Sequence, residues 1–350
     1  MKLGFLYHSS LPHATKLDKL ATKLLMIKRL LDFPGVISIT HLQQYKLMAH
    51  SMTKNAIFRI LHSFCGTVAI AFYCNTGSAV ELITEIHNPP QELSGEHTHE
   101  AEIAHIRKHH LKRLDDKLTI EPKILEQNCR YESDISTKPP TKRVALTFDD
   151  GPEPGQTEFI LEVLKKYDIS AAFFMIGAKV QQHPELVEKV RAANHQIIGN
   201  HSWDHPNFHD ISIAEQAEQV LRNETLLADD LQPRLFRYPY GNSSCETNEL
   251  VRSRGYKIVG WHIDSCDWAF ERTGSVDIKE AISCGVLPQY HSDYVGHVVS
   301  AARARNGGII LMHEIHPNTI KKLDEIIAQL RADGFVFGSI LDEDFQPSLR

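Results

Sequence analysis

From Arg143 onward, short runs of apolar residues alternate with segments in which apolar residues recur every three or four positions. The runs predict β-strands buried on both faces, and the periodic segments predict amphipathic helices. The predicted strands are residues 144–148, 171–176, 196–199, 234–238, 256–263, 309–312 and 335–340. The predicted helices are residues 157–167, 184–193, 213–227, 246–254 and 317–332. About seven strands in about 200 residues of repeated βα units favour an α/β fold, a distorted or incomplete (β/α) barrel of parallel strands, over a doubly wound sheet.

A further helical pattern precedes the barrel pattern, at residues 96–118. Its buried stripe is predicted to be Ile103, Ile106, Leu111, Leu114 and Leu118. Its histidines are His97, His99, His105, His109 and His110. Because they are scattered among Glu, Lys and Arg, we interpret them as a solvated helix face and not as a metal site. Residues 136–140 (STKPP) read as a linker, so residues 80–141 form a helical N-terminal extension and linker.

Charge divides the chain near residue 80. Residues 1–79 contain nine Lys or Arg and only two acids, Asp18 and Asp32, whereas the rest of the chain carries an excess of 13 acidic residues. The whole chain has a formal charge of -6. This charge argues against a nucleic-acid partner, and no apolar run reaches the roughly 18 residues of a membrane span, so no stable span is expected in the mature chain.

Residues 52–79 resemble a signal peptide, with Lys54 and Arg59 before a mostly apolar run and small residues at 77–79. Since the pattern begins 51 residues into the chain, we expect Met52 or Met48 to be the true start and residues 1–51 to be a non-native upstream segment. Use of this leader would make the protein secreted or periplasmic. Two alternatives stay open: the apolar run is a buried helix or strand, or the acid-poor start is an organelle transit peptide.

Four cysteines follow the predicted leader, and an even number suits an oxidising compartment. They are Cys129, Cys245, Cys266 and Cys284. Four cysteines allow three pairings, and the sequence neither chooses among these nor excludes free thiols. Without a CxxC spacing, a zinc–cysteine site is not expected.

Polar residues that bind metals or move protons stand at the ends of five predicted strands. They are Asp149 and Asp150, His201, Arg237, Asp264 and Asp267, and His313. The carboxyl ends of parallel barrel strands lie on one face, where active sites of this architecture are found. The sequence therefore predicts that these distant residues meet in one cleft.

Metal binding is indicated by His201 and His205, which would lie on one side of a helical turn. Two histidines and one carboxylate suit zinc or another divalent transition ion and leave positions open for water, which implies hydrolysis by metal-activated water. Residues 147–152 (TFDDGP) place two mutually repelling carboxylates directly after a strand, where a Gly-Pro turn holds them. One of these carboxylates can bind the metal while the other takes a proton from water.

Residues 147–152 resemble the first motif of the NodB-type polysaccharide deacetylases, carbohydrate esterase family four. Residues 201–205 (HSWDH), 237–241 (RYPYG), 264–268 (DSCDW) and 311–313 (LMH) are similar to the second to fifth motifs, in order. The resemblance covers residues 142–340, and we assign residues 142–344 to the catalytic domain. It implies a distorted (β/α) barrel that removes acetyl groups from a carbohydrate with the help of a metal.

The resemblance also implies a role for each motif residue. Asp150, His201 and His205 become the metal ligands, with zinc the expected ion and cobalt or another transition ion as alternatives. Asp149 becomes the general base for metal-bound water, oriented by Arg237. His313 becomes the acid that protonates the leaving amine, with Asp267 as its partner. The backbone N–H of Tyr240, which follows Pro239, becomes a hydrogen-bond donor to the oxyanion. Trp268 and Leu311 form the pocket for the acetyl group.

The expected reaction is hydrolysis of the N-acetyl amide of an oligo- or polysaccharide that contains N-acetylglucosamine. An O-acetyl carbohydrate esterase would use the same site and differs only in the leaving group. A catalytically inactive carbohydrate-binding barrel is disfavoured because the ligands, base and acid are all present. Residues 269–307 are expected to form a long loop region beside the cleft that could set which carbohydrate enters. Glu314 and His316 are interpreted either as support for the site residues or as surface residues. No sequence feature indicates an oligomeric state.

Overall fold

The computed structural model describes residues 56–62, 68–74 and 99–350, in two compact units divided after Glu92. In the first unit, β1 (Ala56–His62) and β2 (Val68–Cys74) pair antiparallel. Residues 1–51 and half of the predicted leader (residues 52–55, 63–67 and 75–79 of 52–79) lie outside the described residues. The interpretation of both segments therefore stays a prediction.

The second unit is built around one parallel sheet. Its strands are β3 (Arg143–Gly151), β4 (Ala171–Met175), β5 (Ile197–Asn200), β6 (Leu235–Phe236), β7 (Lys257–Ile258), β8 (Ile263–Asp264), β9 (Gly307–His313) and β10 (Val336–Phe337). Their order is β7-β6-β5-β4-β3-β9-β8, and β10 pairs with the start of β3. Because β7 and β8 end this order, the curled sheet is an incomplete barrel, as the sequence pattern predicts.

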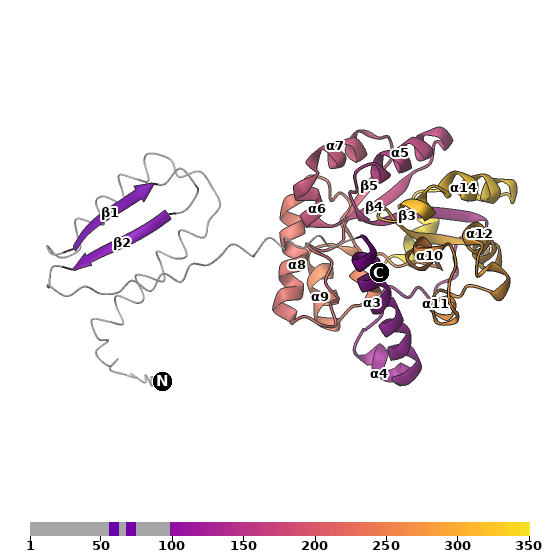
Figure 1. The fold of residues 1–350 in the computed structure, drawn as a ribbon, viewed down its shortest axis with the longest axis horizontal. Coiled ribbons are helices and arrows are strands. Elements are labelled where there is room, and N and C mark those ends of the chain that lie inside the picture. Colours follow the sequence, from indigo (N-terminus) through magenta and orange to yellow (C-terminus); the bar gives the residue numbers. More distant parts are fainter. Residues whose placement is uncertain (1–55, 63–67, 75–98) are drawn as a thin grey trace, which may run out of the picture. The chain divides into compact units, whose positions relative to one another are not determined.

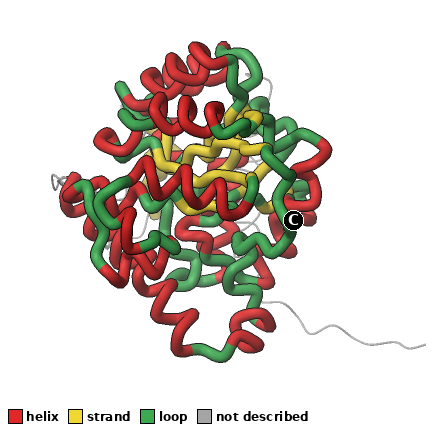
Figure 2. The backbone as a smooth tube through the Cα atoms, turned by 90° about the vertical axis from the view of Figure 1, so that its right-hand side faces the viewer, coloured by secondary structure: helices red, strands yellow, loops and turns green. Residues whose placement is uncertain are grey.

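The two central strands show why the sheet is buried on both faces. Every residue of β9 is buried, and so is every residue of β3 after Arg143. Continuous apolar runs of this kind are typical of parallel strands covered by helices. Inside the sheet, Phe148 and Phe173 pack with ring centroids 5.4 Å apart. In Figure 2 the yellow strands lie in the middle, with red helices around them.

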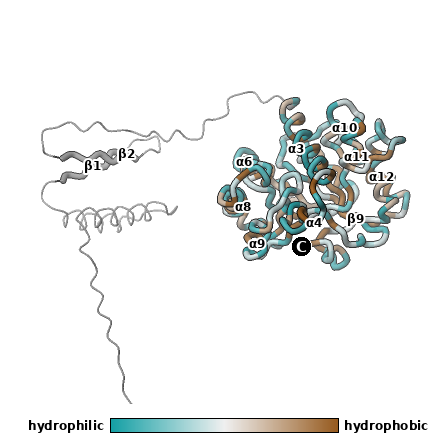
Figure 3. Tube along the Cα trace, turned by 90° about the horizontal axis from the view of Figure 1, so that it is seen from below, coloured by the Kyte–Doolittle hydropathy of each residue, from teal (hydrophilic) through white to brown (hydrophobic). Residues whose placement is uncertain are grey.

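Helices cover the outside of the sheet and carry the connections (Figure 1). They are α5 (Gln156–Tyr167), α6 (Gly177–Gln182), α7 (Pro184–Ala192), α8 (Ile213–Leu226), α9 (Cys245–Ser253), α10 (Asp267–Thr273), α11 (Ile278–Cys284), α12 (Tyr294–Arg305), α13 (Pro317–Ile320) and α14 (Leu323–Ala332), with the short 3-10 turns η1 (Pro239–Gly241), η2 (Pro288–Tyr290) and η3 (Glu343–Ser348). Hydrophobic and hydrophilic residues alternate along the helices (Figure 3), which fits one face packed on the sheet. Ser212 and Glu215 form a capping box that starts α8.

Two predicted elements are each divided in the structure. Residues 256–263 form β7 and β8 and not one strand, because the chain leaves the sheet at Gly260 to pack on another segment. A Cβ at Gly260 would lie 2.0 Å from the carbonyl oxygen of Ser133, so only glycine fits this approach. Residues 317–332 form α13 and α14. Residues 269–307, expected as a loop region, are largely α10, α11 and α12.

The predicted helix before the barrel is present as α3 (His99–Thr119), followed by α4 (Pro122–Gln127). Ile103, Ile106, Leu111 and Leu114 are buried as expected, but Leu118 is 69% exposed because it lies near the end of the helix. The interpretation of the histidines as a solvated face is wrong for His109 and His110, which are buried. Both lie on the side of α3 that packs against α10, α11 and η1.

Two disulfides lie in the described unit, one of the three pairings that the sequence allows. Cys129–Cys245 joins the segment after α4 to the start of α9, and Cys266–Cys284 joins α11 to the loop before α10. Among the described residues, no helix combines the length and the apolar character that a membrane crossing requires.

Candidate active site

The carboxyl ends of the strands bring the predicted site residues together. Asp149 on β3 is paired in register with His313 on β9. On the other side of β3 lies β4, which pairs with β5, and His201 directly follows β5. Arg237 follows β6 and Asp267 follows β8. Asp149, Asp150, His201, Arg237, Asp267 and His313 are all at most 6% exposed. Burying this many ionisable groups is costly unless each has a partner, and the geometry supplies the partners.

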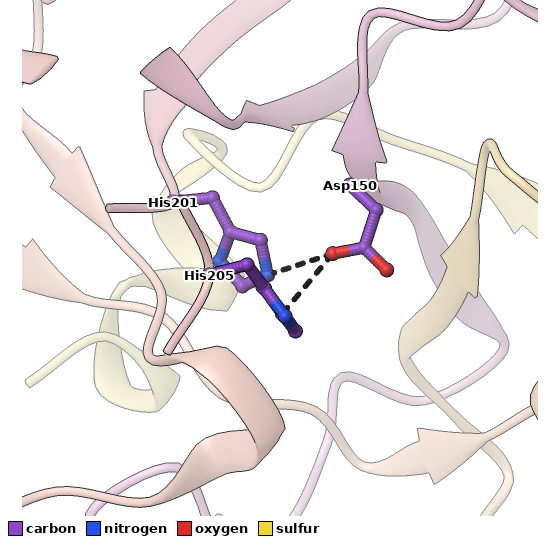
Figure 4. Close-up of side chains that lie close together, drawn as sticks. All are labelled: Asp150, His201 and His205. Atoms are coloured by element: carbon purple, nitrogen blue, oxygen red, sulfur yellow. Dashed lines mark ion pairs between the residues drawn. The ribbon is translucent and has the colours of Figure 1, made fainter. Parts of the chain in front are cut away.

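Asp150, His201 and His205 form a compact cluster at one side of the cleft (Figure 4). One oxygen of Asp150, Oδ1, lies 3.3 Å from Nε2 of His201 and 3.1 Å from Nε2 of His205. This buried oxygen has no conventional hydrogen-bond partner. Burial raises the pKa of Asp150, but the neighbouring histidines lower it well below its usual range, whereas burial lowers the pKa of His205 to about 3. A carboxylate and neutral imidazoles are the protonation states that a divalent metal requires.

The tautomer of His201 supports the same interpretation. Its Nδ1 lies 2.8 Å from the carbonyl oxygen of Arg237, which only accepts, so Nδ1 donates a proton there and Nε2 is the nitrogen that faces Asp150. A metal ligand oriented through its other ring nitrogen is a common arrangement. The three side chains therefore fit a divalent cation, and the donor set of two imidazoles and one carboxylate suits zinc or another transition ion.

The backbone between the two histidines is not the helical turn that the spacing suggested. Residues 201–205 run in an irregular loop, in which Ser202 and His205 have positive φ angles of 70° and 60°. Both imidazoles still face Asp150, because the loop is held by Ser202 Oγ, which accepts from the backbone N–H of His205 at 3.1 Å. The two imidazoles lie on the same side, as predicted, but the predicted reason, a helical turn at residues 201–205, is wrong.

Asp149 is held mainly by a buried guanidinium, and its other oxygen, Oδ2, lies 3.6 Å from Nε2 of His201. Nη1 of Arg237 donates to Oδ1 of Asp149 at 2.7 Å and to the hydroxyl of Thr147 at 2.8 Å. The other nitrogens of Arg237 donate to the carbonyls of Val259 and Gly260. Thr147, which the sequence analysis did not single out, thus helps to fix the arginine that orients Asp149.

His313 and Asp267 form a second buried pair across the cleft. Nδ1 of His313 lies 2.7 Å from Oδ1 of Asp267, and the backbone N–H of His313 donates to Oδ2 of the same carboxylate at 2.7 Å. Burial lowers the pKa of His313, but the charge and hydrogen bond of Asp267 outweigh it and raise the pKa to about 10. His313 is therefore an imidazolium near neutral pH.

Unusual backbone conformations gather around these side chains. The non-glycine residues with positive φ include Asp150, Ser202, His205, Tyr240 and Cys266. Such conformations cost energy and persist only where the surrounding structure enforces them, which is common at functional sites. Tyr240, with a φ of 56°, directly follows Pro239 in the 3-10 turn η1, and Tyr240 and Gly241 of this turn line the cleft.

The two residues predicted for the acetyl pocket lie differently. Leu311 lines the cleft and is 1% exposed, whereas Trp268 is completely buried and stacks on His110, which lines the cleft. The sequence analysis missed several lining residues: Ile106, His110, Tyr238, Gly241 and Trp261. The burial of His110 could have been predicted from the sequence, because it stands four residues from both Ile106 and Leu114 of the predicted buried stripe. Glu314 and His316 are completely buried and so belong to the interior, not the surface.

Comparison with known proteins adds an independent observation. Residues 136–259 match the model of the polysaccharide deacetylase family. A peptidoglycan-N-acetylglucosamine deacetylase of Bacillus cereus is 31% identical over 210 residues, which are 57% of this chain and 86% of that protein. The peptidoglycan-N-acetylglucosamine deacetylase PgdA of Listeria monocytogenes is 35% identical over 201 residues, 57% of this chain.

The matched length differs among relatives. The chain covers 38% of the Listeria protein. The crystal structure of the Bc1960 peptidoglycan N-acetylglucosamine deacetylase aligns with a TM-score of 0.48 and 29% identity, covering 59% of this chain and 89% of that one.

Proposed function

Since this chain belongs to the polysaccharide deacetylase family, we propose that residues 142–344 form a metal-dependent hydrolase that removes N-acetyl groups from an oligo- or polysaccharide containing N-acetylglucosamine. One observation carries this proposal: a buried carboxylate oxygen without a conventional partner lies between two imidazoles, next to a second carboxylate held by an arginine and opposite a charged histidine. The curated relatives named as peptidoglycan deacetylases support a cell-wall glycan as substrate.

The metal site would be formed by Asp150, His201 and His205. A divalent ion such as zinc or cobalt bound there would polarise the acetyl carbonyl and lower the pKa of an attacking water. Asp149 accepts the proton of that water, and Arg237 orients its carboxylate. Because Arg237 pairs with Asp149 alone and His205 with Asp150 alone, one carboxylate can bind the metal while the other takes the proton.

The leaving group is handled on the opposite side of the cleft. A sugar amine leaves only when it is protonated, and the imidazolium of His313 holds a proton for it. Asp267 binds Nδ1 of His313, which directs the other ring nitrogen, Nε2, to the reaction. The backbone N–H of Tyr240 is the proposed donor to the oxygen of the former carbonyl, and Leu311 with Trp268 would enclose the methyl group.

Acetate and free amine released from N-acetylglucosamine oligomers of several lengths, and from peptidoglycan, test this proposal. The chain is measured with added zinc, after chelation and after re-addition of metal. Equal amounts of acetate and new amine, lost on chelation and restored by metal, are expected. Acetate without new amine from an O-acetylated carbohydrate would instead assign an esterase, and ligand binding without release would assign an inactive binding barrel.

The location of the protein follows from the same proposal. A cell-wall substrate and two disulfides both suit a secreted or periplasmic protein. Use of the predicted leader, residues 52–79, would deliver the chain there. Sequencing the N-terminus of the protein from its native source tests this assignment, because cleavage after residue 79 is expected.

A further inference from the structure

Helix α3 lines the cleft that the proposed catalytic residues border. Ile106 and His110 stand one helical turn apart on its buried side, and both border the cleft together with Asp149, Asp150 and His313. Each of the two is only 5% exposed. The volume in which a water molecule can be centred in the cleft is about 10 Å³, which is about what one water molecule needs. An acetylated sugar is larger than one water molecule, so it has to displace Ile106 and His110 to reach the strand ends.

His110 lies where the proposed substrate would pack. Its imidazole is stacked on the indole of Trp268, with ring centroids 4.5 Å apart and an angle of 3° between the planes. Its ring is also 5.7 Å from that of Tyr240 and 6.3 Å from that of His313. The face of Trp268 is the apolar surface assigned above to the acetyl group. A flat ring of the chain itself therefore occupies this surface.

Outside the cleft, α3 is held to α11 and its N-cap by ion pairs. Arg107 donates to Asp277 at 2.7 Å and to Glu280 of α11 at 2.5 Å, and Lys279 reaches Asp115 at 2.8 Å. Arg107, Asp277, Lys279 and Asp115 are each between one third and about one half exposed, whereas the carboxylate of Glu280 is completely buried. The pairs of Asp277 and Asp115 are therefore weak and screened by salt, and the pair with Glu280 is the stronger one. The Cys129–Cys245 disulfide anchors the segment beyond α4, so α3 stays attached to the barrel if these contacts open.

We propose that α3 is an intramolecular inhibitory cover, which competes with the carbohydrate for the cleft through Ile106 and His110. The carbohydrate is admitted when α3 swings away while the segment beyond α4 remains anchored by its disulfide. This inference rests on the proposed function, because the occupied space is the substrate site only if the chain is a deacetylase. It assigns to residues 99–119 the regulation of that site.

The main test compares the double variant Ile106→Ala, His110→Ala with the wild-type chain. Removing both side chains weakens the docking of α3 and empties the cleft, so kcat/KM for acetate release from an N-acetylglucosamine tetramer should rise about tenfold or more, equal to 1.4 kcal/mol or more. Lys108→Ala, on the exposed side of the same helix, is the matched control and should leave kcat/KM unchanged. An unchanged or lower kcat/KM in the double variant would overturn the proposal and make α3 a permanent wall of the site.

A second variant keeps the test independent of the cleft residues. Arg107→Ala removes the ion pairs to α11 without touching the cleft, and Glu280 keeps Arg272 at 3.6 Å. Its kcat/KM should rise by at least about fivefold, because α3 loses one exposed pair and one pair with a buried carboxylate. Added salt should raise the activity of the wild type more than that of this variant, which keeps only the Lys279–Asp115 pair to α11. If thermal unfolding shows that the double variant does not fold, Arg107→Ala decides alone. An unchanged kcat/KM in Arg107→Ala would then overturn the proposal.

Binding separates a failure of the cover from a failure of the proposed function. Calorimetry measures the Kd of the same tetramer for the wild type and the double variant. If no variant releases acetate, the proposed reaction is wrong, yet a cover still predicts a Kd about tenfold lower in the double variant. Equal Kd values, or binding by neither protein, would overturn the cover as well.

Discussion

The strand ends and helix α3 border the same cleft but are held in place differently. At the strand ends, each charged side chain has a buried partner from a distant part of the chain, such as Asp149 with Arg237 and Asp267 with His313. Helix α3 is held by its buried side chains, of which Ile106 and His110 line the cleft, and by ion pairs to α11 that are partly exposed except at Glu280. The difference implies that the proposed reacting groups are fixed by the fold, whereas the proposed cover is a separately attached element. Substitutions at the strand ends should therefore remove the chemistry or the fold, and substitutions around α3 should not.

The largest effect is expected for Asp149→Asn. Asparagine keeps the size and the contact with Arg237 but cannot accept a proton, so kcat should fall by about 10²- to 10⁴-fold. Metal content, measured by atomic emission on the purified protein, should stay at the wild-type level, because Asp149 is not among the proposed ligands. A wild-type kcat in this variant would remove the proposed base.

Asp150→Ala and His201→Ala are the matched comparison for Asp149→Asn. Both should lose the metal together with turnover, since each removes one of three ligands. Retention of a full equivalent of metal in either variant would show that the ligand set is wrong. The consecutive carboxylates would then have to be reassigned.

The next effect concerns the fold at the strand ends. Arg237→Met leaves the buried carboxylate of Asp149 without its cation, and breaking a buried pair in this way costs about 3–5 kcal/mol. Urea unfolding should show this loss. Arg252→Met is the control, because Arg252 is 43% exposed in its pair with Glu132 and its removal should cost less than about 1 kcal/mol. Equal losses in the two variants would mean that the strand-end pair is no more important than a surface pair.

The difference between the two regions also explains what could be predicted from the sequence. His201, Arg237 and His313 were assignable because residues at the carboxyl ends of parallel strands converge, whatever the details of the loops. His110 was not, since a helical stripe shows that a face is buried but not what covers it. Its partner surface, Trp268, lies in α10, far along the chain. The irregular loop at residues 201–205 was missed for a related reason, because positive φ angles at Ser202 and His205 are imposed by surrounding contacts and leave no sequence pattern.

Removing either of the two disulfides should lower stability by an intermediate amount. Replacing Cys129 and Cys245 by serine, or Cys266 and Cys284 by serine, should each lower stability by about 2–4 kcal/mol, measured by thermal unfolding. Only the second replacement lies next to Asp267, so only it should lower kcat. The first frees the segment that carries α3 and should leave kcat at or above the wild-type value. A loss of kcat that is the same in both would contradict the division between reacting groups and cover.

The smallest effect concerns Glu314, which follows His313 and is completely buried. The hydroxyl of Thr157 donates to Oε2, and the carboxyl lies so close to Gly151 that no Cβ would fit there. Burial raises the pKa of Glu314 to about 8 from an ordinary 4.5. Between these values the folded chain keeps a proton that the unfolded chain releases, so this group makes stability fall as the pH rises.

Glu314→Gln keeps a neutral side chain of the same shape and removes this dependence. From about pH 6 to pH 7, the variant should gain about 1.4 kcal/mol relative to the wild type in urea unfolding. Glu249→Gln, at an exposed position of α9, controls for the change in net charge. If wild type and Glu314→Gln lose stability equally over this range, Glu314 is ionised in the fold, and the support for the turn at Gly151 is a charge and not a neutral acid.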